Sequence, residues 1–182
     1  MIARILMAGV VGLTCGLELS LAQTQLSQEQ ALQLMQAEVG TWRGEMQDET
    51  EGSAENPEDF EVRIENEMLG ELWLASDFSG SFDGHTQTGR AILRFDVEKQ
   101  QFIRRWFDSD SEHMTKNIGT WDAETKTFTY LAHFPYQETD MQIKTVVQWP
   151  DNDTRVLTSY LRNSDDEEFV KSFHIVYRRE LE

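Results

Sequence analysis

The stretch with the clearest chemical potential is Arg104-Arg105-Trp106-Phe107-Asp108, which combines cations, large aromatic rings and a carboxylate. Successive side chains of a β-strand alternate between its faces, so Arg104 and Trp106 share one face and Arg105 and Phe107 the other. If Arg104 points inward, its guanidinium fork suits the carboxylate of a fatty acid. If it points outward, it is surface charge beside an aromatic ring. The sequence leaves both interpretations open.

Two histidines are candidate ligand-binding residues. His133 lies in an expected strand on the face opposite Phe128 and Tyr130, and His174 lies in the last expected strand. Neutral imidazole is the commonest protein ligand of metals, but a hydrogen-bonded structural histidine or a surface histidine is the more frequent outcome. Candidate ligand-binding residues are therefore Arg104, Trp106, Tyr130, His133 and His174.

A polar cluster follows the charged strand, with Asp108, Asp110, Glu112 and His113 within six residues. Alternating oxygens of this kind can converge on Ca²⁺. However, the segment lacks the central glycine of the helix-loop-helix calcium loop, and one nearby histidine is too little for a zinc site. We therefore interpret the cluster as a polar turn between strands and assign no metal site.

The same region also supplies the residues for an enzyme hypothesis. Asp108 and His113 could exchange protons and Arg104 could hold an anion, provided that the three side chains converge in a cavity. The sequence contains no nucleophile elbow, phosphate-binding loop, dinucleotide fingerprint or paired-cysteine site. No catalytic residue is assigned, and a non-enzymatic role is favoured.

One helix is expected before the strands, in the N-terminal segment 23–39. Ser27 and Gln30 match a capping box, in which the two side chains bind each other's backbone amides. Apolar residues then recur at helical spacing, which predicts a helix over residues 28–38. Gly40 is expected to end it, and the apolar stripe is expected to pack on one end of the remaining structure.

From Gly40 onward the pattern alternates with a period of two, which is typical of half-buried strands. About ten strands are expected, at residues 41–48, 60–65, 71–79, 85–96, 101–107, 112–121, 127–134, 139–149, 154–162 and 168–179. An acidic loop is expected between the first two. Short turns without helical crossovers indicate an all-β antiparallel up-and-down meander, and closure into a barrel would remove its exposed edges. The barrel domain is expected to span residues 40–182.

Length and charge limit the functions to consider. The chain has 182 residues, which suits one domain, and its formal net charge is −17. Such a charge disfavours nucleic acids and anionic lipid surfaces as partners. A small apolar or amphipathic molecule remains the expected partner, and the protein is expected to be a monomer or a homodimer.

The N-terminus has the pattern of a secretory signal peptide. Arg4 provides the positive charge, residues 5–13 form a short apolar region, and Ser20-Leu21-Ala22 offers a small-x-small cleavage site. The apolar run is too short for a membrane span. We expect residues 1–22 to be removed after Ala22 and the protein to be periplasmic or secreted. The single cysteine, Cys15, would be removed with this segment.

Several short motifs together resemble a known family. Residues 39–45 (Val-Gly-Thr-Trp-Arg-Gly-Glu) resemble the start of calycin-like barrels, which include lipocalins and fatty-acid-binding proteins. More closely, the chain resembles the bacterial family called domain of unknown function 1579. This likeness rests on the same motif, Gly89-Arg90 leading to Phe95-Asp96, Trp106-Phe107-Asp108-Ser109, Gly119-Thr120-Trp121-Asp122 and Tyr177-Arg178-Arg179.

The resemblance implies a lipocalin-like barrel and an exported location, and it implies no activity, because that family is uncharacterised. By analogy with lipocalins, Gly40 and Trp42 would lie at the closed end, with Arg178 or Arg179 stacked on the Trp42 ring. Such a cation–π pair contributes about 0.5–2 kcal/mol. The start of the barrel also resembles nitrobindin-type haem barrels, although Met46 stands where those proteins have a further glycine. This resemblance implies haem as a possible cofactor, with His133 or His174 as the ligand of its iron.

Overall fold

The computed structural model describes residues 25–48, 59–82, 84–136, 139–163 and 167–181. These residues form one helix and ten strands. The helix is α1 (Gln28–Gln36), and the strands are β1 (Gly40–Asp48), β2 (Asp59–Leu69), β3 (Trp73–Phe82), β4 (His85–Asp96), β5 (Gln101–Asp108), β6 (Thr115–Asp122), β7 (Thr127–Tyr136), β8 (Thr139–Gln148), β9 (Thr154–Arg162) and β10 (Val170–Arg179).

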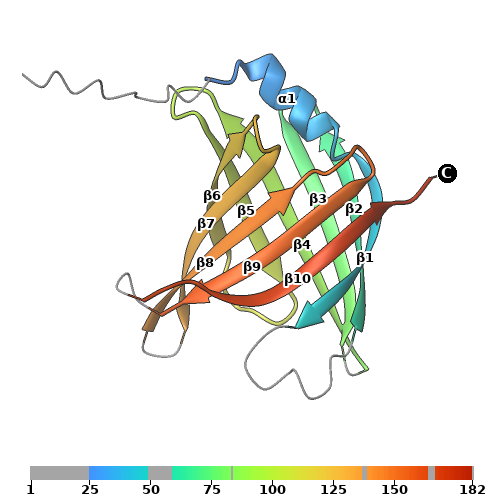
Figure 1. Cartoon of the computed structure of the whole chain (residues 1–182), viewed down its shortest axis with the longest axis vertical. Helices are drawn as coiled ribbons and strands as arrows, with labels where there is room; N and C mark the ends of the chain where they lie inside the picture. The colour runs from blue at the N-terminus through green and yellow to red at the C-terminus, as the bar shows by residue number, and fades with distance from the viewer. Residues whose placement is uncertain (1–24, 49–58, 83, 137–138, 164–166, 182) are drawn as a thin grey trace, which may run out of the picture.

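The ten strands form a closed antiparallel barrel in up-and-down order (Figure 1). Each strand pairs with the next along the chain, and β1 pairs with β10 from Trp42 opposite Arg179 to Asp48 opposite Phe173. Closure leaves no strand edge to template aggregation. The predicted all-β barrel of about ten strands is therefore confirmed. The expected acidic loop falls mainly on residues 49–58, and the expected signal peptide on residues 1–22, both outside the described residues.

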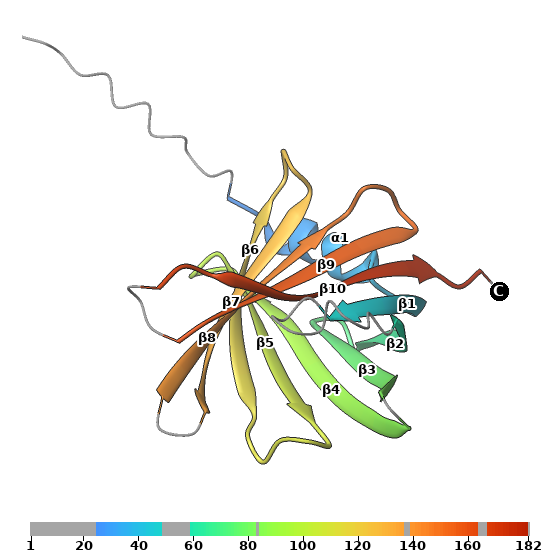
Figure 2. The same cartoon turned by 60° about the horizontal axis from the view of Figure 1, so that its bottom comes forward.

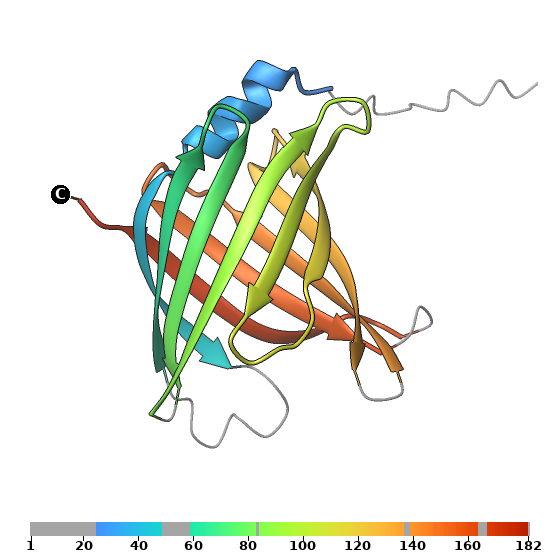
Figure 3. The ribbon, with the colours of Figure 1, turned by 180° about the vertical axis from the view of Figure 1, so that it is seen from behind.

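Helix α1 begins as its sequence predicts. The Ser27 side chain accepts a hydrogen bond from the Gln30 amide, and the Gln30 side chain accepts one from the Ser27 amide, which completes the capping box. Ala31 and Met35 are its buried residues, and the helix lies across one end of the barrel (Figures 1 and 3).

The end of α1 differs from the prediction. The helix stops at Gln36 with Ala37 as its C-cap, so it is two residues shorter than expected and Gly40 does not terminate it. Gly40 is instead the first residue of β1, with a φ of 118°. This backbone conformation suits glycine. A Cβ atom there would also lie 3.0 Å from the guanidinium of Arg179.

The alternation predicted along the strands decides which side chains enter the barrel. Ala91, Leu93 and Phe95 of β4 are buried inside, as the pattern predicts. Beneath α1, aromatic rings pack together inside one end of the barrel. Phe102 and Phe128 meet edge to face with ring centroids 4.9 Å apart, and Trp121, Trp149 and Tyr130 extend the same cluster.

Trp42 joins the first strand to the last at the helix-covered end. Its side chain is buried, and the guanidinium carbon of Arg179 lies 4.1 Å from the centroid of its ring. A second guanidinium, from Arg155 on β9, lies 4.5 Å from the same centroid. Arg178, the other candidate from the sequence, is exposed and donates to the Thr154 hydroxyl. The structure therefore assigns the stacking to Arg179.

The three residues between α1 and β1 are held by side chains of the barrel. The Ala37 carbonyl accepts from Arg179 at 2.7 Å, and the Val39 carbonyl also accepts from Arg179. The Glu38 carbonyl accepts from the Trp42 indole and the Asn66 amide, both at 2.9 Å. These bonds satisfy carbonyls that a helix end leaves without partners, so they fix α1 on the barrel.

The Glu38 side chain adds an ion pair to this junction. Its carboxylate lies 2.7 Å from Nε of Arg155, whose side chain is only 4% exposed. Burial raises the pKa of Glu38 above its ordinary range, although Arg155, Arg179 and Arg104 act in the opposite direction. Removing either partner would leave a charge buried without compensation.

Three glycines of the barrel wall lie beneath aromatic rings. A Cβ on Gly119 would lie 2.4 Å from the Tyr130 ring, one on Gly89 would lie 2.5 Å from the Trp106 ring, and one on Gly44 would lie 2.9 Å from Tyr177. Real atoms do not approach this closely, so each ring fits in its position only because the residue beneath it is glycine.

We predict that Gly119→Ala destabilises the protein by roughly 1–3 kcal/mol, because the added methyl forces the Tyr130 ring and the backbone apart. Urea unfolding followed by tryptophan fluorescence measures this change. Thr120→Ala, at the exposed neighbouring position, is the matched control. A free energy of unfolding unchanged in Gly119→Ala would contradict the close packing described.

We predict that Glu38→Gln becomes more stable relative to wild type as the pH rises from about 4 to about 8. Folding raises the pKa of the Glu38 carboxyl, so its protonated form stabilises the folded protein. This stabilisation is fully present below the pKa in the unfolded chain. It is lost as the pH rises through the pKa in the folded protein. Urea unfolding at each pH measures the difference, with exposed Glu29→Gln as the control for the loss of one charge. If wild type instead became more stable relative to Glu38→Gln as the pH rises, the pKa of Glu38 would be lowered by folding, which would contradict the prediction.

Candidate functional site

The barrel interior holds two adjoining cavities. One, of about 110 Å³, lies under α1. The other, of about 340 Å³, extends toward the opposite end of the barrel, which Figure 2 turns toward the viewer. Both are lined by Ile64, Phe78, Arg104, Trp106, Leu157 and Tyr177. These shared residues make the two cavities parts of a single interior site with Arg104 at their junction.

The smaller cavity has mainly apolar walls. Its lining includes Leu34 and Met35 of α1 and the barrel residues Leu74, Leu93, Phe128, Val147 and Trp149. Apolar cavities of about 150 Å³ hold a benzene molecule, so this space accommodates at most a small apolar group.

The larger cavity has two kinds of wall. The neighbouring strands β10, β1, β2 and β3 contribute Phe173, Ile175, Met46, Ile64 and Phe78, which are apolar. The next strands around the barrel, β4, β5 and β6, contribute Gln87, Asp108, Thr115 and Asn117, which are polar, together with Arg104 and Trp106. A molecule that matches both walls is amphipathic.

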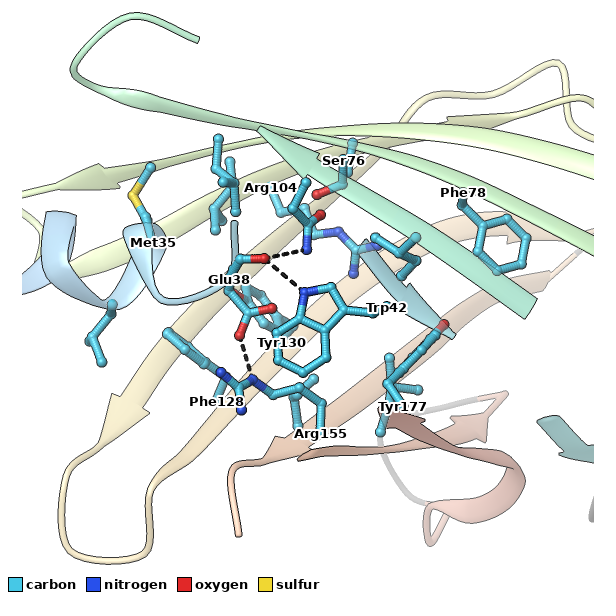
Figure 4. Close-up of a pocket in the computed structure, with 18 of the residues that line it drawn as sticks. Met35, Glu38, Trp42, Ser76, Phe78, Arg104, Phe128, Tyr130, Arg155 and Tyr177 are labelled. Atoms are coloured by element: carbon cyan, nitrogen blue, oxygen red, sulfur yellow. Dashed lines mark hydrogen bonds and ion pairs between the residues drawn. The ribbon is translucent and has the colours of Figure 1, made fainter. Parts of the chain in front are cut away.

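Arg104 enters the interior from β5 (Figure 4). Trp106, on the same face of the strand, lines the same two cavities. Its guanidinium carbon lies 5.2 Å from the centroid of the Trp106 ring. Burial lowers the pKa of Arg104, while the nearby Tyr130, Tyr177 and Glu38 oppose this effect. Among the described residues, none accepts a hydrogen bond from its guanidinium.

The two interior arginines differ in their partners (Figure 4). Arg155 is neutralised by Glu38 and donates further bonds to the Asp151 and Thr154 carbonyls. Arg104 forms no ion pair among the described residues, although the Glu38 carboxylate lies near enough to oppose the lowering of its pKa. Asp108 lies four residues further along β5, so its Cα atom is roughly 13 Å from that of Arg104 at strand spacing. The Asp108 carboxylate accepts a hydrogen bond from the Trp106 indole at 2.8 Å.

Tyr130 and Tyr177 complete the surroundings of Arg104. Both side chains are buried and line the cavity under α1. Burial raises the pKa of both phenols, so they are neutral and can donate hydrogen bonds. Because Tyr130 lies over Gly119 and Tyr177 over Gly44, the positions of both rings are fixed by the barrel wall.

The structure places the predicted ligand-binding residues in two groups. Arg104, Trp106 and Tyr130 line the interior site. His133 is exposed on the outer face of β7, and His174 lies in a depression on the outer face of β10. All four histidines of the chain fall in described segments, and none of them lines either cavity. The histidine candidates therefore do not join Arg104.

The polar cluster after β5 forms a structured turn. The Asp110 carboxylate lies 3.1 Å from the His85 ring, and its amide donates to Asp108 at 3.0 Å. The His113 amide donates to the Ser111 hydroxyl. In the described part of the chain, no three histidine, cysteine or acidic side chains are grouped to hold a metal ion. His113 is exposed and does not line the larger cavity, whereas Asp108 and Arg104 do.

Sequence reasoning missed several residues of the site, namely Glu38, Asn66, Asn117, Arg155 and Tyr177. Arg155 could have been found, because it shares a strand face with Leu157 and Ser159, where a charge is unexpected. Glu38 gave no such signal, since a carboxylate in the last residues of an expected helix is ordinarily exposed.

Comparison with solved structures shows the same fold. Rv2717c from M. tuberculosis has a TM-score of 0.60 and 13% identity, covering 83% of this chain and 98% of that chain. The S-type phycobiliprotein lyase CPES from Guillardia theta has a TM-score of 0.51 and 12% identity, covering 82% of this chain and 92% of that chain. The search of curated proteins gave no match.

No helix among the described residues has the length and apolar character needed to cross a bilayer. The family model described as "Protein of unknown function (DUF1579)" matches residues 27–179, a range that contains α1 and every strand of the barrel. The family model matches most of the chain and includes the motifs that gave the resemblance. The chain therefore belongs to the DUF1579 family.

Proposed function

We propose that this protein is a non-enzymatic binding module that holds a small apolar or amphipathic molecule inside its barrel. The observation that carries the proposal is the interior site, two adjoining cavities of about 110 and 340 Å³ with mainly apolar walls. Sites for small molecules are typically concave, mostly apolar and supplied with a few polar groups. Arg104, Tyr130 and Tyr177 are such groups.

The barrel supports this role because its walls are fixed before any ligand arrives. Closure pairs every strand on both sides, and the junction of Trp42, Arg155 and Arg179 holds α1 over one end. A preformed site avoids the entropy lost when a flexible site is ordered by its ligand. The aromatic packing under α1 narrows that end without filling the interior.

The haem-binding and enzyme hypotheses gain no support from the site. A haem iron inside the barrel needs a ligand on the cavity wall, and the histidines lie elsewhere. The proposed acid–base set needs His113 beside Asp108 in the cavity, and His113 is exposed on the turn after β5.

We also propose that the protein acts after export. The support is the sequence pattern of Arg4, the apolar residues 5–13 and the Ser20-Leu21-Ala22 site. An exported barrel would meet its ligand outside the cytoplasm.

We predict that Asn117→Phe abolishes binding of the neutral apolar probe N-phenyl-1-naphthylamine, because the larger ring occupies the wider cavity. Lys116→Phe places the same ring on the exposed outer face of β6 and should leave binding unchanged. Fluorescence titration of wild type and both variants measures the dissociation constants, and thermal unfolding verifies that they fold. Equal binding by Asn117→Phe and wild type would place the probe outside the barrel and contradict the proposal.

We predict that the full chain, expressed in a bacterium, is recovered from the periplasm or the medium with Gln23 as its first residue. Ala22→Arg should block this processing, because the residue before the cut must be small. N-terminal sequencing and fractionation measure the outcome. An intact N-terminus on cytoplasmic protein would contradict export.

A further inference from the structure

Resting on the proposed binding function, we infer that the ligand is an amphipathic organic anion whose acidic group binds Arg104 between Tyr130 and Tyr177. The first support is the position of Arg104. It lies at the junction of the two cavities and lines both. Any molecule that occupies the wider cavity to its full depth therefore meets this guanidinium.

The second support is the missing counter-charge. Arg104 is half-buried, and a cation partly removed from water is costly unless it is paired and hydrogen-bonded. The Glu38 carboxylate is bound to Arg155 at 2.7 Å, and the Asp108 carboxylate is bound to the Trp106 indole at 2.8 Å. Neither carboxylate forms an ion pair with Arg104, and the acceptors that share its cavity, such as the Asn66 carbonyl oxygen, are uncharged. A carboxylate presents two oxygens to the guanidinium fork and would supply that partner.

The third support is the arrangement of the neighbouring aromatic side chains. Trp106 lies against Arg104, and Trp106, Tyr130 and Tyr177 rest on Gly89, Gly119 and Gly44. The two phenols are neutral donors, so they can bind an anion and cannot replace one. Arg104 is thus accompanied by two hydroxyl groups that can donate and by ring faces in fixed positions, as in a preorganised anion site.

The cavity volumes indicate how such a ligand lies. The space under α1, about 110 Å³, is smaller than the roughly 150 Å³ that holds benzene, so it cannot take the main apolar part. The wider cavity, about 340 Å³, provides an apolar wall on β10, β1, β2 and β3. We therefore place the acidic group deep at Arg104 and the apolar part in the wider cavity, toward the end opposite α1.

The experiment compares three ligands that share one eight-carbon chain, namely octanoate, octanol and octylamine, by isothermal titration calorimetry. Wild type should bind octanoate about 10- to 100-fold more tightly than octanol, as expected for hydrogen bonds to a charged partner, and octylamine most weakly. Arg104→Met should lose this preference, whereas Arg105→Met, an exposed neighbour on the outer face of β5, should keep it.

A second readout separates binding from structural support. If Arg104 has no partner in the empty barrel, Arg104→Met should raise the melting temperature of the empty protein by roughly 2–8 °C and lose the further rise that octanoate gives wild type. Should Arg104→Met fail to fold, which itself would indicate a structural role, the wild-type series and Arg104→Lys still decide the inference. Arg104→Lys should retain a weaker preference for octanoate.

Two outcomes overturn different claims. Equal affinities of wild type for octanoate and octanol, or octanoate binding unaffected by Arg104→Met, would refute the anion site and leave the binding module standing. No binding of any of the three ligands, together with no binding of N-phenyl-1-naphthylamine, would refute the binding module itself.

Discussion

The junction around Trp42 is the constraint on which the rest of this structure depends. Trp42 stands at the start of the first strand, and the guanidinium groups of Arg179 and Arg155 lie 4.1 and 4.5 Å from its ring. The same arginines bind carbonyls of residues 37 and 39, and Glu38 pairs with Arg155. First strand, last two strands and helix are therefore joined through one aromatic ring. Each stacking contact contributes about 0.5–2 kcal/mol, but together they decide where the barrel closes and which end α1 covers.

This junction also determines the charge of the interior. Glu38 forms its ion pair with Arg155 and acts on Arg104 only through the longer-range attraction of opposite charges, so Arg104 faces the cavity without a carboxylate bound to it. A fold under selection for stability alone would replace such a side chain by an apolar one, because an unpaired cation partly removed from water is costly. Its presence at the junction of two cavities is the feature that connects the packing of the barrel with the binding of a ligand.

Much of the fold could be predicted from the sequence, because strand alternation and turn residues are local signals. The capping box at Ser27, the strand at residues 85–96 and the shared face of Arg104 and Trp106 all follow from local spacing. The direction of the Arg104 face could not be predicted, since both faces of β5 carry an arginine and an aromatic ring. The Glu38–Arg155 pair joins residues 117 positions apart, and no local pattern records it.

The measurement that tests this account most directly is native mass spectrometry of residues 23–182, produced in a bacterium and purified without denaturant. Wild type should carry one small molecule in stoichiometric amount, which is released on denaturation and detected as an acid. Arg104→Met, prepared in the same way, should carry far less of it. A ligand-free wild type that also binds none of the probe molecules added to it, or an equal load of a neutral molecule on both proteins, would contradict the account.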